Sequence, residues 1–159
     1  MKPELLAEAP PVIKEFLGYV GTIRGKSPKT VEEYYLDLRT FFRYIKKNQG
    51  LIPPTTEFNE ISISDVDLDL IKTITLTTVY EYMNYLTTEC YNKAATRSRK
   101  VSSLRTFFKY LTNKTGKLAV NPVEELETPK LKQSLPKYLT LEQSLELLSK
   151  VEGATKERD

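Results

Sequence analysis

The sequence of 159 residues contains no histidine, no tryptophan and a single cysteine, Cys90. Without histidine the chain cannot form the serine–histidine or cysteine–histidine pairs of common hydrolases, nor a zinc site with imidazole ligands. One cysteine cannot form a disulfide within the chain. These absences exclude most familiar catalytic and metal centres, so we expect no catalytic residue, no metal ion and no cofactor.

Long apolar runs are missing as well. The existing runs are too short for a transmembrane helix, and an N-terminus with Glu4 and Glu8 among prolines lacks the basic-then-apolar pattern of a secretory signal. A content of 40% hydrophobic and 28% charged residues is typical of soluble globular proteins. We therefore expect a cytoplasmic protein without a membrane partner.

The formal net charge of +3 conceals an uneven distribution along the chain. Residues 24–47 sum to +4 and residues 92–117 to +8, whereas residues 48–91 sum to −6. The +8 block contains no acidic residue at all. Two basic blocks in one small chain favour a nucleic-acid partner. The alternatives are a solvated basic face and a helical protein–protein interaction module whose basic face docks an acidic partner.

The first half of the chain predicts two helices. Apolar residues at helical spacing predict one over Val12–Tyr19. Ser27 as N-cap, followed by Pro28 at the first helical position, predicts a second helix that ends near Gln49.

The second half predicts two more helices after an acidic connection at residues 51–75. Part of that connection, Ile61–Leu68, alternates like a short strand. Thr78 and Glu81 predict a capping box that begins the third helix. The fourth helix is expected over Lys93–Thr112. The pattern predicts an all-α, compact four- to five-helix bundle over residues 1–127, a linker over 128–139, and the start of a further domain over 140–159.

The two basic helices predict a surface for phosphate groups. On a helical wheel, Lys93, Arg97 and Lys100 share the side that Leu104 and Phe108 occupy further along, so the basic start of this helix should project past the core. Hydroxyls and lysines around the start of the second helix suit phosphate binding, and a basic stripe continues along that helix. The residues expected to contact DNA are Lys26, Ser27, Lys29, Thr30, Arg39, Arg43, Lys93, Thr96, Arg97, Arg99, Lys100 and Arg105.

Several other conspicuous side chains are expected to be structural. Aromatic residues at helical spacing are more often core than base-stacking platforms, and Cys90 is expected to be a small buried hydrophobe. The aromatic residues expected in the core are Tyr34, Tyr35, Phe107, Phe108 and Tyr110.

Two motifs resemble a known family. Ser27-Pro28-Lys29-Thr30, followed by Tyr34, Asp37-Leu38 and Phe41, resembles the opening of the N-terminal core-binding (SAM-like) domain of tyrosine recombinases of the phage-integrase and Xer type. The stretch Arg99–Leu111 is similar to the fourth-helix signature of that family.

The segments that follow resemble the linker into the catalytic domain of these recombinases. They are Asn121-Pro122, Pro129-Lys130 and Leu135–Thr140. Together with the two motifs, the resemblance spans about Val12 to Leu148.

The resemblance implies a fold, a partner and a division of labour. In the family, the core-binding and catalytic domains clamp duplex DNA from opposite sides, and helices two and four of the core-binding domain lie against the DNA. A tyrosine nucleophile, two arginines, a lysine and His/Trp-type residues act in the C-terminal domain. Because this chain has neither histidine nor tryptophan, no catalytic residue is carried over, and we expect a non-catalytic piece of a longer recombinase. Its expected partners are double-stranded DNA and other recombinase protomers on DNA, while the free chain should be monomeric or weakly associating.

Overall fold

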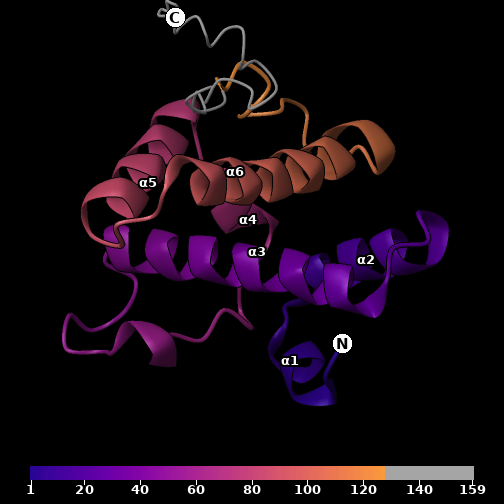
Figure 1. Cartoon of the computed structure of the whole chain (residues 1–159), viewed down its shortest axis with the longest axis horizontal. Helices are drawn as coiled ribbons and strands as arrows, with labels where there is room; N and C mark the ends of the chain where they lie inside the picture. Colours follow the sequence, from indigo (N-terminus) through magenta and orange to yellow (C-terminus); the bar gives the residue numbers. More distant parts are fainter. Residues whose placement is uncertain (128–159) are drawn as a thin grey trace, which may run out of the picture. The chain divides into compact units, whose positions relative to one another are not determined.

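The computed structural model describes residues 1–127, which contain helices and turns but no strand. The α-helices are α1 (Pro3–Glu8), α2 (Pro11–Gly18), α3 (Pro28–Asn48), α4 (Leu68–Ile71), α5 (Leu76–Thr88) and α6 (Ala94–Lys109). A 3₁₀ turn covers Phe58–Glu60, and π-helical turns at Tyr19–Ile23 and Tyr110–Lys114 extend α2 and α6. Figure 1 shows the long α3 and α6 lying across one another with the shorter helices around them. The predicted all-α class is confirmed, whereas the predicted linker and the segment 140–159 lie outside the described residues.

Local capping chemistry explains why α3 begins and ends where the sequence predicts. The Ser27 Oγ accepts a hydrogen bond from the backbone N–H of Thr30 at 3.2 Å, and Pro28 occupies the first helical position. The helix ends at Asn48, and Gly50 follows with a φ of 68°. That left-handed conformation favours glycine because it has no Cβ. The N-terminal α1 was not predicted, and it buries none of its side chains, so it leaves no apolar stripe in the sequence.

The start of α5 differs from the prediction. The N-cap is Thr75, whose Oγ1 accepts from the N–H of Thr78 at 3.2 Å, while the Thr78 Oγ1 accepts from the N–H of Thr75 at 3.3 Å. This reciprocal pair is the capping box, so the predicted pairing of Thr78 with Glu81 is wrong and α5 begins three residues earlier. Cys90 is exposed rather than buried, because it follows the last turn of α5.

Aromatic rings from four helices form the core. Phe16 of α2 meets Phe107 of α6 edge-on at 5.2 Å between ring centroids, and Phe41 of α3 meets Tyr82 of α5 at 5.0 Å. Phe42 of α3 lies 6.0 Å from Phe107. Edge-to-face pairs of this kind add about 0.5–1.5 kcal/mol each beyond their burial. The core assignment is confirmed for Tyr35, Phe107, Phe108 and Tyr110, which are buried, while Tyr34 is half-buried.

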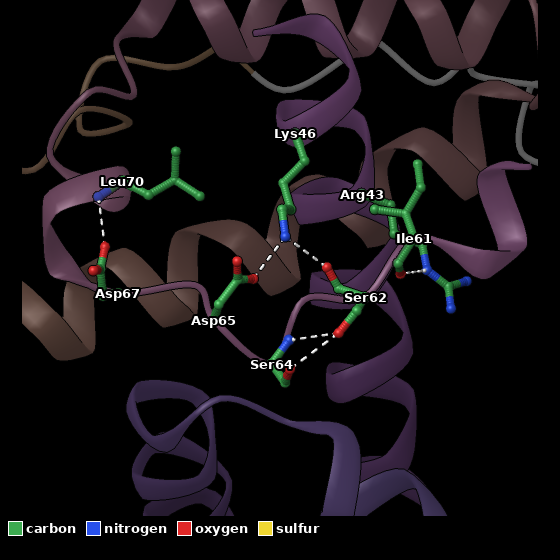
Figure 2. A network of polar contacts seen from close by, with 8 residues as sticks. All are labelled: Arg43, Lys46, Ile61, Ser62, Ser64, Asp65, Asp67 and Leu70. Carbon is green, nitrogen blue, oxygen red and sulfur yellow. Dashed lines mark hydrogen bonds and ion pairs between the residues drawn. The ribbon is translucent and has the colours of Figure 1, made fainter. Parts of the chain in front are cut away.

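The acidic connection of residues 51–75 is fixed to α3 by two cations (Figure 2). The Lys46 Nζ donates to the carbonyl of Ser62 at 2.8 Å and to the Asp65 Oδ1 at 2.6 Å. The Arg43 Nε donates to the carbonyl of Ile61 at 2.9 Å. These carbonyls therefore bond to α3 side chains instead of a second strand, and the strand-like alternation does not produce a strand. The buried residues of the connection are Ile61, Ile63, Val66, Ile71 and Ile74.

The pairing of Lys46 with Asp65 predicts a pH-dependent stability. The hydrogen bond from Lys46 lowers the pKa of Asp65, so the unfolded chain binds this proton more readily than the folded one. Its stabilisation is present above the ordinary aspartate pKa of about 3.9 and is lost as pH falls through the lower folded value. We expect Lys46→Met to lower the free energy of unfolding by about 1–2 kcal/mol at pH 7 and by less near pH 3. Urea unfolding at both pH values measures this, and an equal loss at both would contradict it.

Among the helices of residues 1–127, none combines the length and the apolar composition needed to span a bilayer.

Candidate nucleic-acid interface

The start of α6 presents unpaired backbone donors and positive charge together. Lys93 is the N-cap residue and its side chain makes no capping hydrogen bond, and the first turn contains no acidic residue. The first N–H groups of a helix have no partner inside the helix, and the helix dipole is positive at this end. A cation here is electrostatically unfavourable in the free protein, whereas a phosphate would satisfy both features.

The residue before this start carries backbone strain. Tyr91 has a φ of 54° and its side chain is 83% exposed. A bulky residue rarely adopts this left-handed conformation. The sequence analysis did not single out Tyr91, because backbone conformation at one residue leaves no pattern in the sequence.

A buried carboxylate joins α6 to α3. The Arg99 Nη1 donates to the Asp37 Oδ1 at 2.8 Å and to its Oδ2 at 2.7 Å, and the Ser103 Oγ donates to the same Oδ2 at 2.6 Å. The Asp37 side chain is only 5% exposed, whereas Arg99 is 50% exposed. Asp37 therefore holds one edge of the guanidinium, and the rest of this group faces solvent.

The other predicted residues of α6 are placed in different ways. Lys93 is exposed, and Lys100 and Thr96 are half-buried. The Arg97 Nη1 donates to the carbonyl of Asn92 at 2.6 Å, so this arginine folds back toward the helix start. Arg105 donates through Nη2 to the carbonyl of Leu126 and so contacts the chain after α6.

The outward side of α6 carries residues that the sequence analysis missed. Arg99, Ser102 and Lys109 are exposed and Thr106 is half-buried, while Val101, Leu104 and Phe108 on the other side are buried. The spacing of the buried residues was a signal for this outward side, because the positions between them must face away from the core. We call Arg99, Ser102, Thr106 and Lys109 the α6 stripe.

The predicted residues of α3 fall into two groups. Lys26, Ser27 and Lys29 are exposed and Thr30 is half-buried, all at the start of the helix. Ser27 and Thr30 also bond to one another, with 3.0 Å between their hydroxyl oxygens.

Arg39 and Arg43 form the second group and make intramolecular contacts. The Arg39 Nη1 lies 2.9 Å from the Glu8 Oε2, and its guanidinium lies 5.8 Å from the centre of the Tyr35 ring. Arg43 donates to the carbonyl of Ile61. The two arginines thus contact α1 and the acidic connection, and the structure does not bring them together with the cations of α6.

The two lysine clusters lie at opposite ends of the helical unit. Figure 1 draws the start of α3 and the end of α6 toward one side, and the start of α6 beside α5 toward the other. Ring contacts agree, because Phe16 of α2 and Tyr19 of the turn that follows it both contact Tyr110 just after α6. Lys26 and Lys29 therefore lie toward the end of α6, and the α6 stripe connects the two clusters.

Comparisons with known proteins identify relatives over nearly the whole chain. The chain is 46% identical over 150 residues to the tyrosine recombinase XerC of Caldanaerobacter subterraneus subsp. tengcongensis, covering 94% of this chain and 42% of that protein. It is 33% identical over 144 residues to the tyrosine recombinase XerD of Listeria monocytogenes (91% and 42%). It is 26% identical over 142 residues to the tyrosine recombinase XerC of Chlorobaculum parvum (89% and 38%).

No protein-family model and no solved structure matches the chain. The chain spans about two-fifths of the length of the curated relatives it matches. The level of identity and its extent along the chain confirm the resemblance carried by the motifs at Ser27–Phe41 and Arg99–Leu111. By its sequence, this chain belongs to the Xer-type family of tyrosine recombinases.

Proposed function

We propose that residues 1–127 are a DNA-binding unit of a site-specific tyrosine recombinase, with duplex DNA lying along α6 and reaching the start of α3. In this role the unit would clamp DNA for recombination or integration together with other protomers, and it would contribute binding rather than strand cleavage. The observation that carries the proposal is the start of α6, where Lys93 and unpaired backbone N–H groups occur without a nearby acid.

The charge of α6 and its surroundings supports this partner. Residues 92–117 contain eight cations and no carboxylate. Lys93, Lys100, Lys109 and Lys114 make no ion pair within residues 1–127. Unpaired cations of one sign attract a polyanion, and release of the DNA counterions drives its binding.

The dimensions of α6 also suit a duplex. Its 16 residues span about 24 Å at 1.5 Å per residue. At 3.4 Å per base pair, this length corresponds to about seven base pairs. DNA along the α6 stripe would meet Lys93 and Lys100 near one end, and Lys26 and Lys29 near the other. Hydroxyls of Ser102 and Thr106 lie between these cations, and such groups commonly contact phosphate.

The salt dependence of binding tests the proposal. If about five cations each neutralise one phosphate, the logarithm of the association constant should fall against the logarithm of salt concentration with a slope of about −4 to −5. Fluorescence anisotropy with a labelled duplex between about 50 and 200 mM salt measures this slope. A slope near zero would contradict the proposal. Sedimentation velocity of the free chain, run alongside, would show self-association if the basic face instead docks the acidic connection of another copy.

A further inference from the structure

A basic pocket lies at the end of α6, away from the helix start that carries the proposed function. Its volume is about 470 Å³. The lining comes from the turn after α2, the last part of α6 and the turn after α6. The residues that line it are Tyr19, Arg24, Thr106, Lys109, Tyr110 and Lys114.

Positive charge in this pocket has no counterpart among its lining residues. Arg24, Lys109 and Lys114 contribute three cations, and no carboxylate lines the pocket. None of the three makes an ion pair within the described part of the chain. The carboxylate of Glu15 is near Tyr110, but it is bound to the Lys117 Nζ at 2.5 Å. Like charges around one pocket repel one another, so a bound anion would relieve this repulsion.

The uncharged residues define what kind of anion fits. The rings of Tyr19 and Tyr110 lie 4.8 Å apart and form an aromatic wall. The Thr106 Oγ1 already donates to the carbonyl of Ser102 at 3.0 Å, so the donors for a ligand are those of the three cations. A planar guanidinium and two ammonium groups match the several acceptor oxygens of a phosphate group.

We propose that this pocket holds one backbone phosphate of the DNA that lies along α6, an inference that rests on the proposed function. Thr106 and Lys109 belong both to the α6 stripe and to the pocket lining, so the pocket continues the same surface. Lys109 follows Arg99 by ten residues, which is about 15 Å along the helix. This distance corresponds to four or five base pairs at about 3.4 Å each, so one short duplex can reach both places.

A triple variant, Arg24→Ala with Lys109→Ala and Lys114→Ala, tests the inference. Lys2→Ala with Lys47→Ala and Lys72→Ala is the matched control, because it removes the same charge from exposed positions outside the pocket. The first measurement is the melting temperature in inorganic phosphate against chloride at equal ionic strength. We expect phosphate to raise the melting temperature of the unmodified chain and the control by a few degrees, because a ligand that binds only the folded state stabilises it. The triple variant should show no such rise.

The second measurement is binding of a labelled duplex over a salt series. Because one phosphate is held by three cations, the triple variant should lose about one unit of salt slope rather than three, and the control should lose none. In low salt without phosphate, the triple variant should melt no lower than the unmodified chain, since the repulsion is gone.

The outcomes separate this inference from the proposed function. A triple variant with unchanged DNA affinity and unchanged slope would overturn the inference, while the proposed function would still stand if the slope stayed near −4 to −5. Phosphate protection confined to the unmodified chain and the control, with no change in DNA binding, would assign the pocket to a free anion and overturn the DNA-backbone assignment. A chain that binds no DNA at all would overturn both.

Discussion

Replacing Arg99 with alanine is expected to lower the free energy of unfolding by about 2 kcal/mol. The substitution removes both contacts of Arg99 with Asp37, at 2.8 and 2.7 Å, and leaves a carboxylate that is 5% exposed with one hydrogen bond from Ser103. Breaking a buried ion pair costs about 3–5 kcal/mol, and the half-exposed guanidinium reduces this through solvent screening. Urea unfolding at pH 7 measures the loss.

A double-mutant cycle shows whether the uncompensated charge is the cause. Asp37→Asn combined with Arg99→Ala removes both charges while keeping a hydrogen-bonding side chain, so we expect it to recover at least half of the stability that Arg99→Ala loses. Arg99→Lys should fall between, because an ammonium keeps the charge but not the two-contact geometry. A double variant as unstable as Arg99→Ala, or an Arg99→Ala variant within about 0.5 kcal/mol of the unmodified chain, would contradict this account.

The largest effect on DNA binding is expected from the start of α6. Replacing Lys93, Arg97 and Lys100 together with alanine should weaken duplex binding by about 100-fold or more, because each charged contact contributes about 1.5–3 kcal/mol in favourable cases. The salt slope should become less negative by about 2.7. None of the three side chains forms an ion pair within residues 1–127, so the fold should persist. Anisotropy titrations measure both quantities.

Circular dichroism provides the folding control for this variant. Alanine has the highest helix propensity, so helicity should be unchanged or higher. The Lys2, Lys47 and Lys72 triple variant again matches the charge removed. Comparable losses in the two triple variants would mean that net charge alone controls binding. Undiminished binding in the α6 variant would place the interface elsewhere on the molecule.

Local chemistry made much of the fold predictable. The serine-proline start of α3 and its aromatic spacing act within a few residues of one another, so sequence alone located a helix of 21 residues. The start of α5 was misplaced, because the rule that pairs threonine with glutamate fitted Thr78 and Glu81, whereas two threonines, Thr75 and Thr78, satisfy the same backbone groups. Competing caps a few residues apart are nearly equal in free energy, and tertiary packing selects between them.

The candidate site was predicted less completely. The charge of residues 92–117 indicated α6, and the motifs indicated the family. Which cations face solvent was not evident, because Arg39 pairs with Glu8 from 31 residues away and Arg43 bonds to a carbonyl 18 residues away. Position on a helical wheel also favoured Arg97 over Lys109, but Arg97 folds back onto Asn92 while Lys109 is exposed.

The sequence by itself determined the helical class, the length of α3, the basic character of α6 and the relationship to Xer-type recombinases, since each depends on residue types at short spacing. Only the tertiary structure decided that Asp37 holds Arg99 across 62 residues, that Lys46 fixes the acidic connection, and that Arg24 joins Lys109 and Lys114 around one pocket. The physical reason is that a charged side chain pairs with whichever opposite charge or carbonyl the packing of the core brings within reach. That choice is made by the burial of aromatic residues on several helices at once, and no short stretch of sequence contains it.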